Sequence, residues 1–254
     1  MMFTVILSLL LSSAFSRPHV DPEMTDILNS MVEEIDEKIT HKPILKLIEQ
    51  MAPSKVAAGE KLVLRCEVTS TPTAVFYWTH NGVLVQGDKN LNVIEKLLNS
   101  GRRTVQSGIV SSEFVIPCAS SSDAGVYKCV AVNGYKTIES EAEVTVVGDS
   151  AQCKPAHRSA PTISQWTDSR FEAEGNTATL VCRSHSATKT VTSWTFEGEL
   201  INTQGGRFEV LENGDLLVRN IRWEDMGSYE CIVSNKYGEA RVETFLYPSK
   251  KLSA

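Results

Sequence analysis

The sequence of 254 residues lacks the features on which catalysis and nucleic-acid binding usually depend. Its five histidines are scattered without metal-ligand spacing, and no His-Glu-x-x-His, Cys-x-x-Cys, Gly-x-Ser-x-Gly or glycine-rich phosphate-binding motif occurs. Lys and Arg number 25 against 31 Asp and Glu, so no basic surplus is available to neutralise nucleic-acid phosphates. We therefore expect neither an enzyme nor a nucleic-acid-binding protein, and no metal or cofactor.

Long hydrophobic runs are also missing, except at the start of the chain. Residues 1–16 read MMFTVILSLLLSSAFS, an apolar stretch followed by small residues, which is typical of a secretory signal peptide although only the terminal amine supplies positive charge. No later run approaches the roughly 18 apolar residues of a membrane span, and residues 249–254 form a short polar tail without an anchor signal. We expect a secreted, soluble extracellular protein without membrane insertion, in which disulfide bonds form.

A repeat becomes visible when the chain is aligned on its cysteines. Cys66 and Cys182 are each followed, 12 residues later, by a tryptophan. Each half then reaches the pattern D-x-G-x-Y-x-C, as DAGVYKC at 123–129 and as DMGSYEC at 225–231. Four kinds of residue thus recur in the same order at nearly the same spacing, which indicates two copies of one domain.

The residues around this repeat favour β-strands. Apolar and polar residues alternate at 62–66 and at 178–182, as half-buried antiparallel strands require. Asn-Gly pairs at 81–82, 133–134 and 213–214 lie between apolar runs and predict two-residue hairpin turns of type I′, in which both residues need a positive φ. Both patterns predict an all-β chain.

The Cys…Trp…Tyr-x-Cys pattern resembles the immunoglobulin fold. The resemblance implies two tandem sandwiches of I-set or C2 type at residues 43–147 and 161–248, joined by a linker at 148–160. A linker this short restricts the angle between the sandwiches without fixing it. In each domain a disulfide joins the two sheets, the tryptophan packs on it and the tyrosine forms a corner. The implied pairs are Cys66–Cys129, with Trp78 and Tyr127, and Cys182–Cys231, with Trp194 and Tyr229.

Two cysteines lie outside this pattern. Cys118 falls at the end of an expected strand of the first domain, and Cys153 falls in the linker. A bond between them would tie the linker to the first domain. The alternatives are two free thiols or intermolecular bridges, which an oxidising compartment disfavours. We predict the Cys118–Cys153 bond, provided that the two Cα atoms lie within disulfide reach.

An acidic segment precedes the first domain at residues 17–42. Asp-Pro at 21–22 suits a helix start, and six aliphatic residues between 27 and 39 recur on one side of a helix with acidic residues largely opposite. This pattern predicts an amphipathic helix. It could bind a partner, but a helix that frays or docks on its own domain is favoured, because short isolated helices are marginal in water.

The first domain carries an insertion. Between its tryptophan and its last cysteine it has 14 more residues than the second domain, including an apolar set. An exposed apolar surface marks an interaction site, although side chains that cover the edge of their own sheet are the favoured alternative. The candidate partner-binding residues are Leu91, Ile94, Leu97 and Leu98.

Three segments of the second domain carry a more specific resemblance: ENGDLLV at 212–218, IRWEDMGSYEC at 221–231 and FLYP at 245–248. They resemble the nematode secreted two-immunoglobulin, or zwei Ig, proteins and an insect secreted two-immunoglobulin protein that binds insulin-like peptides. The nematode proteins imply an adhesion-type extracellular function that maintains axon and neuron position after development. The insect protein implies sequestration of a hormone. We therefore predict a secreted binding protein of the nervous system with an extracellular or cell-surface partner, and insulin-like peptide binding as the alternative.

Overall fold

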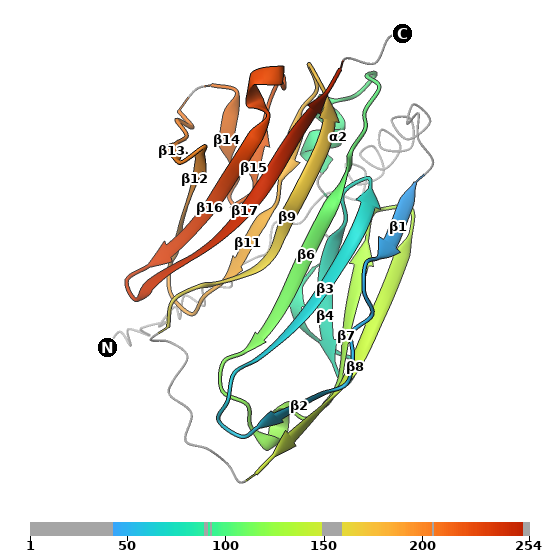
Figure 1. Cartoon of the computed structure of the whole chain (residues 1–254), viewed down its shortest axis with the longest axis vertical. Coiled ribbons are helices and arrows are strands. Elements are labelled where there is room, and N and C mark those ends of the chain that lie inside the picture. Colours follow the sequence, from blue (N-terminus) through green and yellow to red (C-terminus); the bar gives the residue numbers. More distant parts are fainter. Residues whose placement is uncertain (1–42, 89–90, 92, 149–158, 205, 251–254) are drawn as a thin grey trace, which may run out of the picture.

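The computed structural model describes residues 43–88, 91, 93–148, 159–204 and 206–250 (Figure 1). The expected signal peptide at 1–16 and the expected helix within 17–42 lie outside the described residues. The regular secondary structure of the described residues is almost entirely β-strand, arranged as two sandwiches. The predicted all-β class with two tandem immunoglobulin domains is confirmed.

The first domain has two layers of strands. One layer holds β1 (Ile44–Leu47), β3 (Leu62–Thr71) and β6 (Ser107–Ile116). The other holds, in spatial order, β2 (Ser54–Ala57), β8 (Thr137–Val147), β7 (Gly125–Val132), β4 (Val75–His80) and β5 (Val83–Gly87). Exposed and buried residues alternate along the first half of β3, because one face of that strand packs on the core and the other faces solvent.

The second domain repeats this plan. One layer holds β9 (Thr162–Ala173), β17 (Gly238–Ser249), β16 (Gly227–Asn235), β12 (Val191–Phe196) and β13 (Glu199–Leu200). The other holds β10 (Ala178–Leu180), β15 (Leu216–Val218) and β14 (Phe208–Val210), while β11 (Cys182–His185) pairs with β9. Short 3₁₀ turns, η1 (Ser121–Asp123) and η3 (Trp223–Asp225), lead into β7 and β16.

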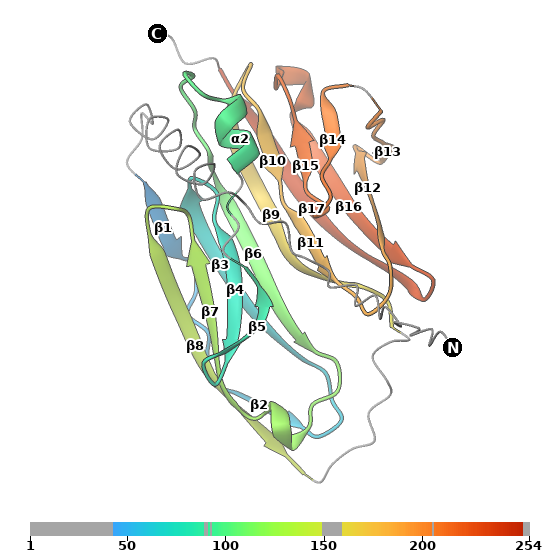
Figure 2. The ribbon, with the colours of Figure 1, turned by 180° about the vertical axis from the view of Figure 1, so that it is seen from behind.

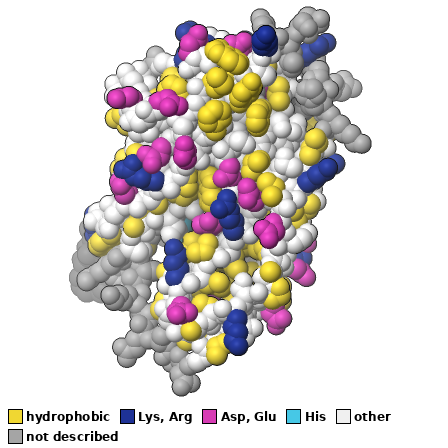
Figure 3. Space-filling model, viewed as in Figure 1, with side chains coloured by type: hydrophobic (Ala, Val, Ile, Leu, Met, Phe, Trp, Pro, Cys, Tyr) yellow, Lys and Arg dark blue, Asp and Glu magenta, His cyan; other side chains and the backbone are white. Residues whose placement is uncertain are grey.

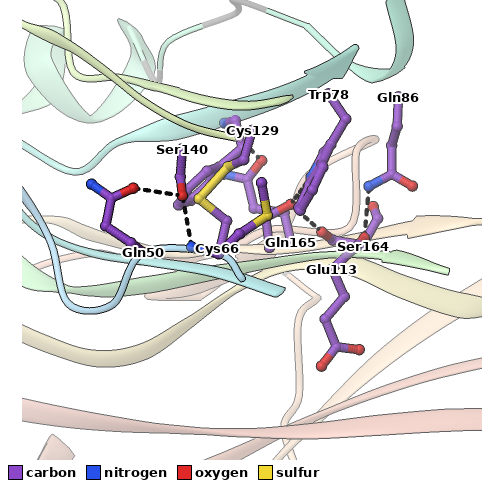
Figure 4. Close-up of a disulfide and its surroundings, with 12 residues drawn as sticks. Gln50, Cys66, Trp78, Gln86, Glu113, Cys129, Ser140, Ser164 and Gln165 are labelled. Carbon is purple, nitrogen blue, oxygen red and sulfur yellow. Dashed lines mark hydrogen bonds between the residues drawn. A yellow bond between two sulfur atoms is a disulfide. The ribbon is translucent and has the colours of Figure 1, made fainter. Parts of the chain in front are cut away.

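Each core is built on a disulfide and an indole. In the first domain Cys66 is bonded to Cys129, and Trp78 is buried beside this bond (Figure 4). The Trp78 Nε1 donates a hydrogen bond to the Ser112 Oγ (2.9 Å), whose own hydroxyl donates to the carbonyl of Ser164 in the second domain (2.7 Å). The first core is therefore connected directly to the neighbouring domain.

The second core has the same parts. Cys182 is bonded to Cys231, and Trp194 is buried beside them. The corner tyrosine is buried in both domains, and its hydroxyl donates to a backbone carbonyl four residues upstream at 3.0 Å in each case, from Tyr127 to Asp123 and from Tyr229 to Asp225.

The remaining cysteine pair is described in part. Cys118 is disulfide-bonded. Cys153 lies outside the described residues, and the bond between the two stays a prediction.

The two sandwiches share one sheet. Strand β6 pairs antiparallel with β9, from Ser107 opposite Phe171 to Ser112 opposite Gln165. The β1-β3-β6 layer and the β9-β17-β16-β12-β13 layer thereby form one continuous sheet, which faces the viewer in Figure 1. The expectation that the linker leaves the interdomain angle unfixed is wrong. Strand β6 would be an unpaired edge of the first domain, and β9 satisfies its backbone groups.

The predicted hairpin turns are correct at one of three positions. Asn81 and Gly82 both have a positive φ (49° and 82°), as a type I′ turn requires. At 133–134 and 213–214 only the glycine does, because these connections are longer and the asparagine side chains accept backbone N–H groups two residues ahead. The second domain places its own tight turn at Glu197 and Gly198 (φ 49° and 85°).

Candidate functional site

The insertion of the first domain reaches across to the second. Its helix α2 (Val93–Leu98) lies beside β10, as Figure 2 shows. The Asn99 side chain that follows the helix donates to the Thr177 carbonyl and accepts from the Thr177 N–H, both at 2.7 Å, and the Thr179 N–H donates to Glu95 (2.8 Å). Residues 178–182 are all buried, so the predicted half-buried alternation is wrong there, because α2 covers the outer side of β10.

Three buried charged side chains hold this junction together. Arg170 on β9 is fully buried and contacts Glu95 of α2 and Glu172 of its own strand, the latter at 3.2 Å. Glu172 is also fully buried and accepts the backbone N–H groups of Val105 (2.9 Å) and Gln106 (3.1 Å). Arg170 thus pairs with two carboxylates, one from each domain.

This arrangement makes stability depend on pH through Glu95. Burial raises the pKa of the Glu95 carboxyl above its ordinary value of 4.5, Glu172 adds to this increase, and Arg170 opposes it. The cost of ionising Glu95 in the folded state is absent below the ordinary pKa and fully present above the raised pKa.

We expect Glu95→Gln to gain stability relative to the unchanged protein as pH rises from about 4.5 to 7, because glutamine does not ionise. Urea unfolding of both proteins across this pH range measures the difference between their free energies of unfolding. The contributions of the other titrating groups are the same in both proteins and cancel in this difference. A difference that does not change with pH would contradict the raised pKa of Glu95.

An aromatic surface lies on the open face of the joined sheet. We define it as Phe171 of β9, Phe245 and Tyr247 of β17, and Trp223 of η3, with exposed fractions of 41%, 45%, 38% and 46%. Phe171 and Tyr247 are opposite each other in register with ring centroids 5.6 Å apart, and Trp223 meets Tyr247 edge-on at 6.1 Å. Figure 3 shows hydrophobic side chains gathered at the end of this face where β9 and β17 finish.

Sequence reasoning did not find this surface. The two aromatic residues of β17 lie two positions apart and therefore share one face of the strand. This spacing was the only signal in the sequence that could have indicated the aromatic surface. Phe171 lies on β9 and Trp223 lies in the turn before β16. The local sequence does not indicate that either residue lies next to the aromatic residues of β17.

The candidate partner-binding residues of the insertion lie elsewhere. Ile94, Leu97 and Leu98 of α2 are exposed (46%, 36% and 39%), whereas Leu91 is half-buried and lies against Gly134. The favoured interpretation, that these side chains cover the edge of their own sheet, is wrong for the three residues of α2. The helix uses Glu95 to contact the second domain, which turns the apolar side chains outward.

The described part of the chain contains no group of three or more His, Cys, Asp or Glu side chains that could hold a metal ion. Nor does it contain a helix long and apolar enough to cross a membrane.

Two sandwiches with buried disulfides and an exposed aromatic surface define a two-domain protein of the immunoglobulin superfamily. Residues 45–146 match the immunoglobulin I-set domain, and residues 160–235 match a second immunoglobulin domain family.

The chain is 49% identical to Zwei Ig domain protein zig-3 of Caenorhabditis elegans, over 95% of this chain and 96% of that protein. It is 44% identical to zig-4 of the same organism over the whole of both chains. The chain therefore belongs to the zwei Ig family, which confirms the resemblance seen in the second domain. The solved structure of neural ectodermal development factor IMP-L2 is also similar, with 27% identity and a TM-score of 0.63 over 83% of this chain and 97% of that one.

Proposed function

We propose that this protein is secreted and acts outside the cell as a binding protein that maintains the position of axons and neuronal cell bodies. Its partner is an extracellular or cell-surface protein. Membership of the zwei Ig family supports the extracellular assignment. The observation that carries the binding role is the aromatic surface, because large exposed apolar patches mark interaction sites and Trp and Tyr dominate binding hot spots.

The surroundings of the aromatic surface suit recognition. Phe171, Phe245 and Tyr247 lie on paired strands of a sheet that spans both domains, so these residues lose little conformational freedom when a partner binds. Further along β16 and β17 the exposed side chains are charged and paired, with Arg241 contacting both Glu230 and Glu239 at 2.9 Å. An apolar centre beside a polar rim is the usual composition of a protein–protein interface.

We expect Tyr247→Ala to weaken binding of the purified protein to cultured neurons at least tenfold, since truncating a hot-spot aromatic residue costs about 2 kcal/mol or more. Titration of fluorescently labelled protein on the cells measures this change. Tyr237→Ala is the matched control, because Tyr237 is equally exposed (40%) at the turn between β16 and β17. If Tyr247→Ala bound to the cells as tightly as Tyr237→Ala, the aromatic surface would not be the binding site.

Loss of the protein from the animal that makes it is expected to displace axons that had first been laid out correctly.

The alternative function is sequestration of an insulin-like peptide. The likeness to IMP-L2 and the outward apolar side chains of α2 favour it. Submicromolar binding of insulin-like peptides, lost in Leu97→Asp and kept in Tyr247→Ala, would support hormone binding at α2. If no insulin-like peptide bound, hormone sequestration would be excluded and the neuronal function would stand as the proposal.

A further inference from the structure

A cleft of about 400 Å³ lies between the two domains, away from the aromatic surface. Its walls come from β5 and the residue after it in the first domain and from β11 in the second. Its floor is the seam between them, formed by Ser112, Ser164 and Gln165. The cleft therefore exists only because β6 and β9 hold the domains in one sheet.

The two walls are strand edges rather than strand faces. Successive side chains of a strand point to opposite faces, so a wall made by one face would contain alternate residues. Here the lining is consecutive, residues 84–88 on one side and residues 183–185 on the other. Strand β5 is the last strand of its sheet, and β11 pairs only with β9 among the described strands. Unpaired edges present backbone N–H and C=O groups to whatever enters.

The cleft continues into a second hollow of about 450 Å³. Both are lined by Arg183 and Ser184, and the second runs on past Thr192 to the loop at 210–214. A groove with this elongated course suits an extended chain better than a compact molecule.

The residues of the floor are uncharged, whereas Asp88, His185 and Glu212, which also line the two hollows, have exposed side chains. Gln165 is buried, and its amide spans to the backbone of the first domain, accepting from the Phe76 N–H (3.3 Å) and donating to the Ala74 carbonyl (3.4 Å). The charge of Arg183 is balanced by buried Asp215 at 3.3 Å. Beside them Leu84 and Val85 of β5 are exposed by 58% and 42%.

We propose that this groove binds an extended peptide segment of another extracellular protein, uncharged where it crosses the floor, which pairs as an added strand with the edge of β5 that no described strand covers. Backbone hydrogen bonds supply affinity in such strand addition, and side-chain pockets supply specificity. Apolar side chains of the segment lie against Leu84, and small side chains lie over the serine floor. The site is separate from the aromatic surface and does not depend on the function proposed for it.

The test is a selection of phage-displayed random dodecapeptides on the full secreted protein, counter-selected against Ser184→Trp, which fills the junction of the two hollows. We expect enriched peptides that alternate apolar and small residues. Their synthetic forms should bind at least tenfold more weakly to Ser184→Trp and to Leu84→Asp. Binding to Ser54→Trp should be unchanged, because Ser54 is a half-buried serine on β2, outside both hollows.

Hydrogen exchange of the unchanged protein decides the location independently of the variants. Bound peptide should slow the exchange of amides in β5 and β11. Protection of β9 and β17 instead, or no enrichment over the counter-selection, would overturn the proposal. Crosslinks between residues 17–42 and β5 in the protein without peptide would assign the groove to the chain's own N-terminal segment and would overturn it as well.

Discussion

Replacing Arg170 by methionine is expected to lower the free energy of unfolding by about 3–5 kcal/mol, because the change strands two buried carboxylates without their cation. Glu95 and Glu172 would remain in a site that water does not reach, 3% and 0% exposed. Methionine fills much of the same volume, so the lost charge rather than a cavity dominates the effect. Urea unfolding at neutral pH, followed by tryptophan fluorescence, measures the loss.

Two comparisons separate this explanation from a general effect of removing arginine. Arg219→Met removes an exposed partner of Glu209 and should cost about 0–1 kcal/mol. Adding Glu95→Gln and Glu172→Gln to Arg170→Met should recover a large part of the stability, since neutral amides are less costly to bury than unpaired charges. An Arg170→Met protein as stable as the Arg219→Met protein would show that the buried network contributes nothing.

Removing the first-domain disulfide by Cys66→Ala with Cys129→Ala should cost about 4 kcal/mol. The bond closes a loop of 63 residues, and its loss enlarges the conformational freedom of the unfolded chain. Against a typical net stability of about 5–15 kcal/mol, such a loss brings the domain close to unfolding at body temperature. The urea midpoint under non-reducing conditions measures it, and an unchanged midpoint would contradict the expectation.

The matched experiment is Cys182→Ala with Cys231→Ala in the second domain, where the loop spans 49 residues. A similar loss of about 4 kcal/mol is expected, because loop-closure entropy changes slowly with length. The β6–β9 pairing and the Arg170 network join the domains, so each double variant should also lower the unfolding midpoint of the other domain. Independent midpoints would mean that the shared sheet contributes little coupling.

Local patterns in the sequence were sufficient for each sandwich taken alone. The Cys…Trp…Tyr-x-Cys pattern resembles the immunoglobulin fold, this resemblance implied the Cys66–Cys129 bond, and the structure contains it. Turns were less well predicted, because Asn-Gly suits several loop lengths and the type depends on where the flanking strands end. The insertion was recognised from its length, but its helix was not predicted.

The contacts between the domains depend on the tertiary structure. Nothing in the local sequences of β6 and β9 indicates that each strand is the other's neighbour. Arg170 and Glu172 resemble solvent-facing charges of an ordinary strand. They are buried because Glu95 of α2 contacts Arg170 and the backbone at 105–106 contacts Glu172. The aromatic surface likewise needs two strands and a turn to meet.

The order and spacing of residues thus determined two disulfide-bonded sandwiches, because those signals act within one domain and recur in both. The joined sheet, the buried arginine, the aromatic surface and the groove beside β5 were decided by tertiary structure. Each of them is made by segments from opposite sides of the linker or from separate strands, and only folding sets the distance between such segments.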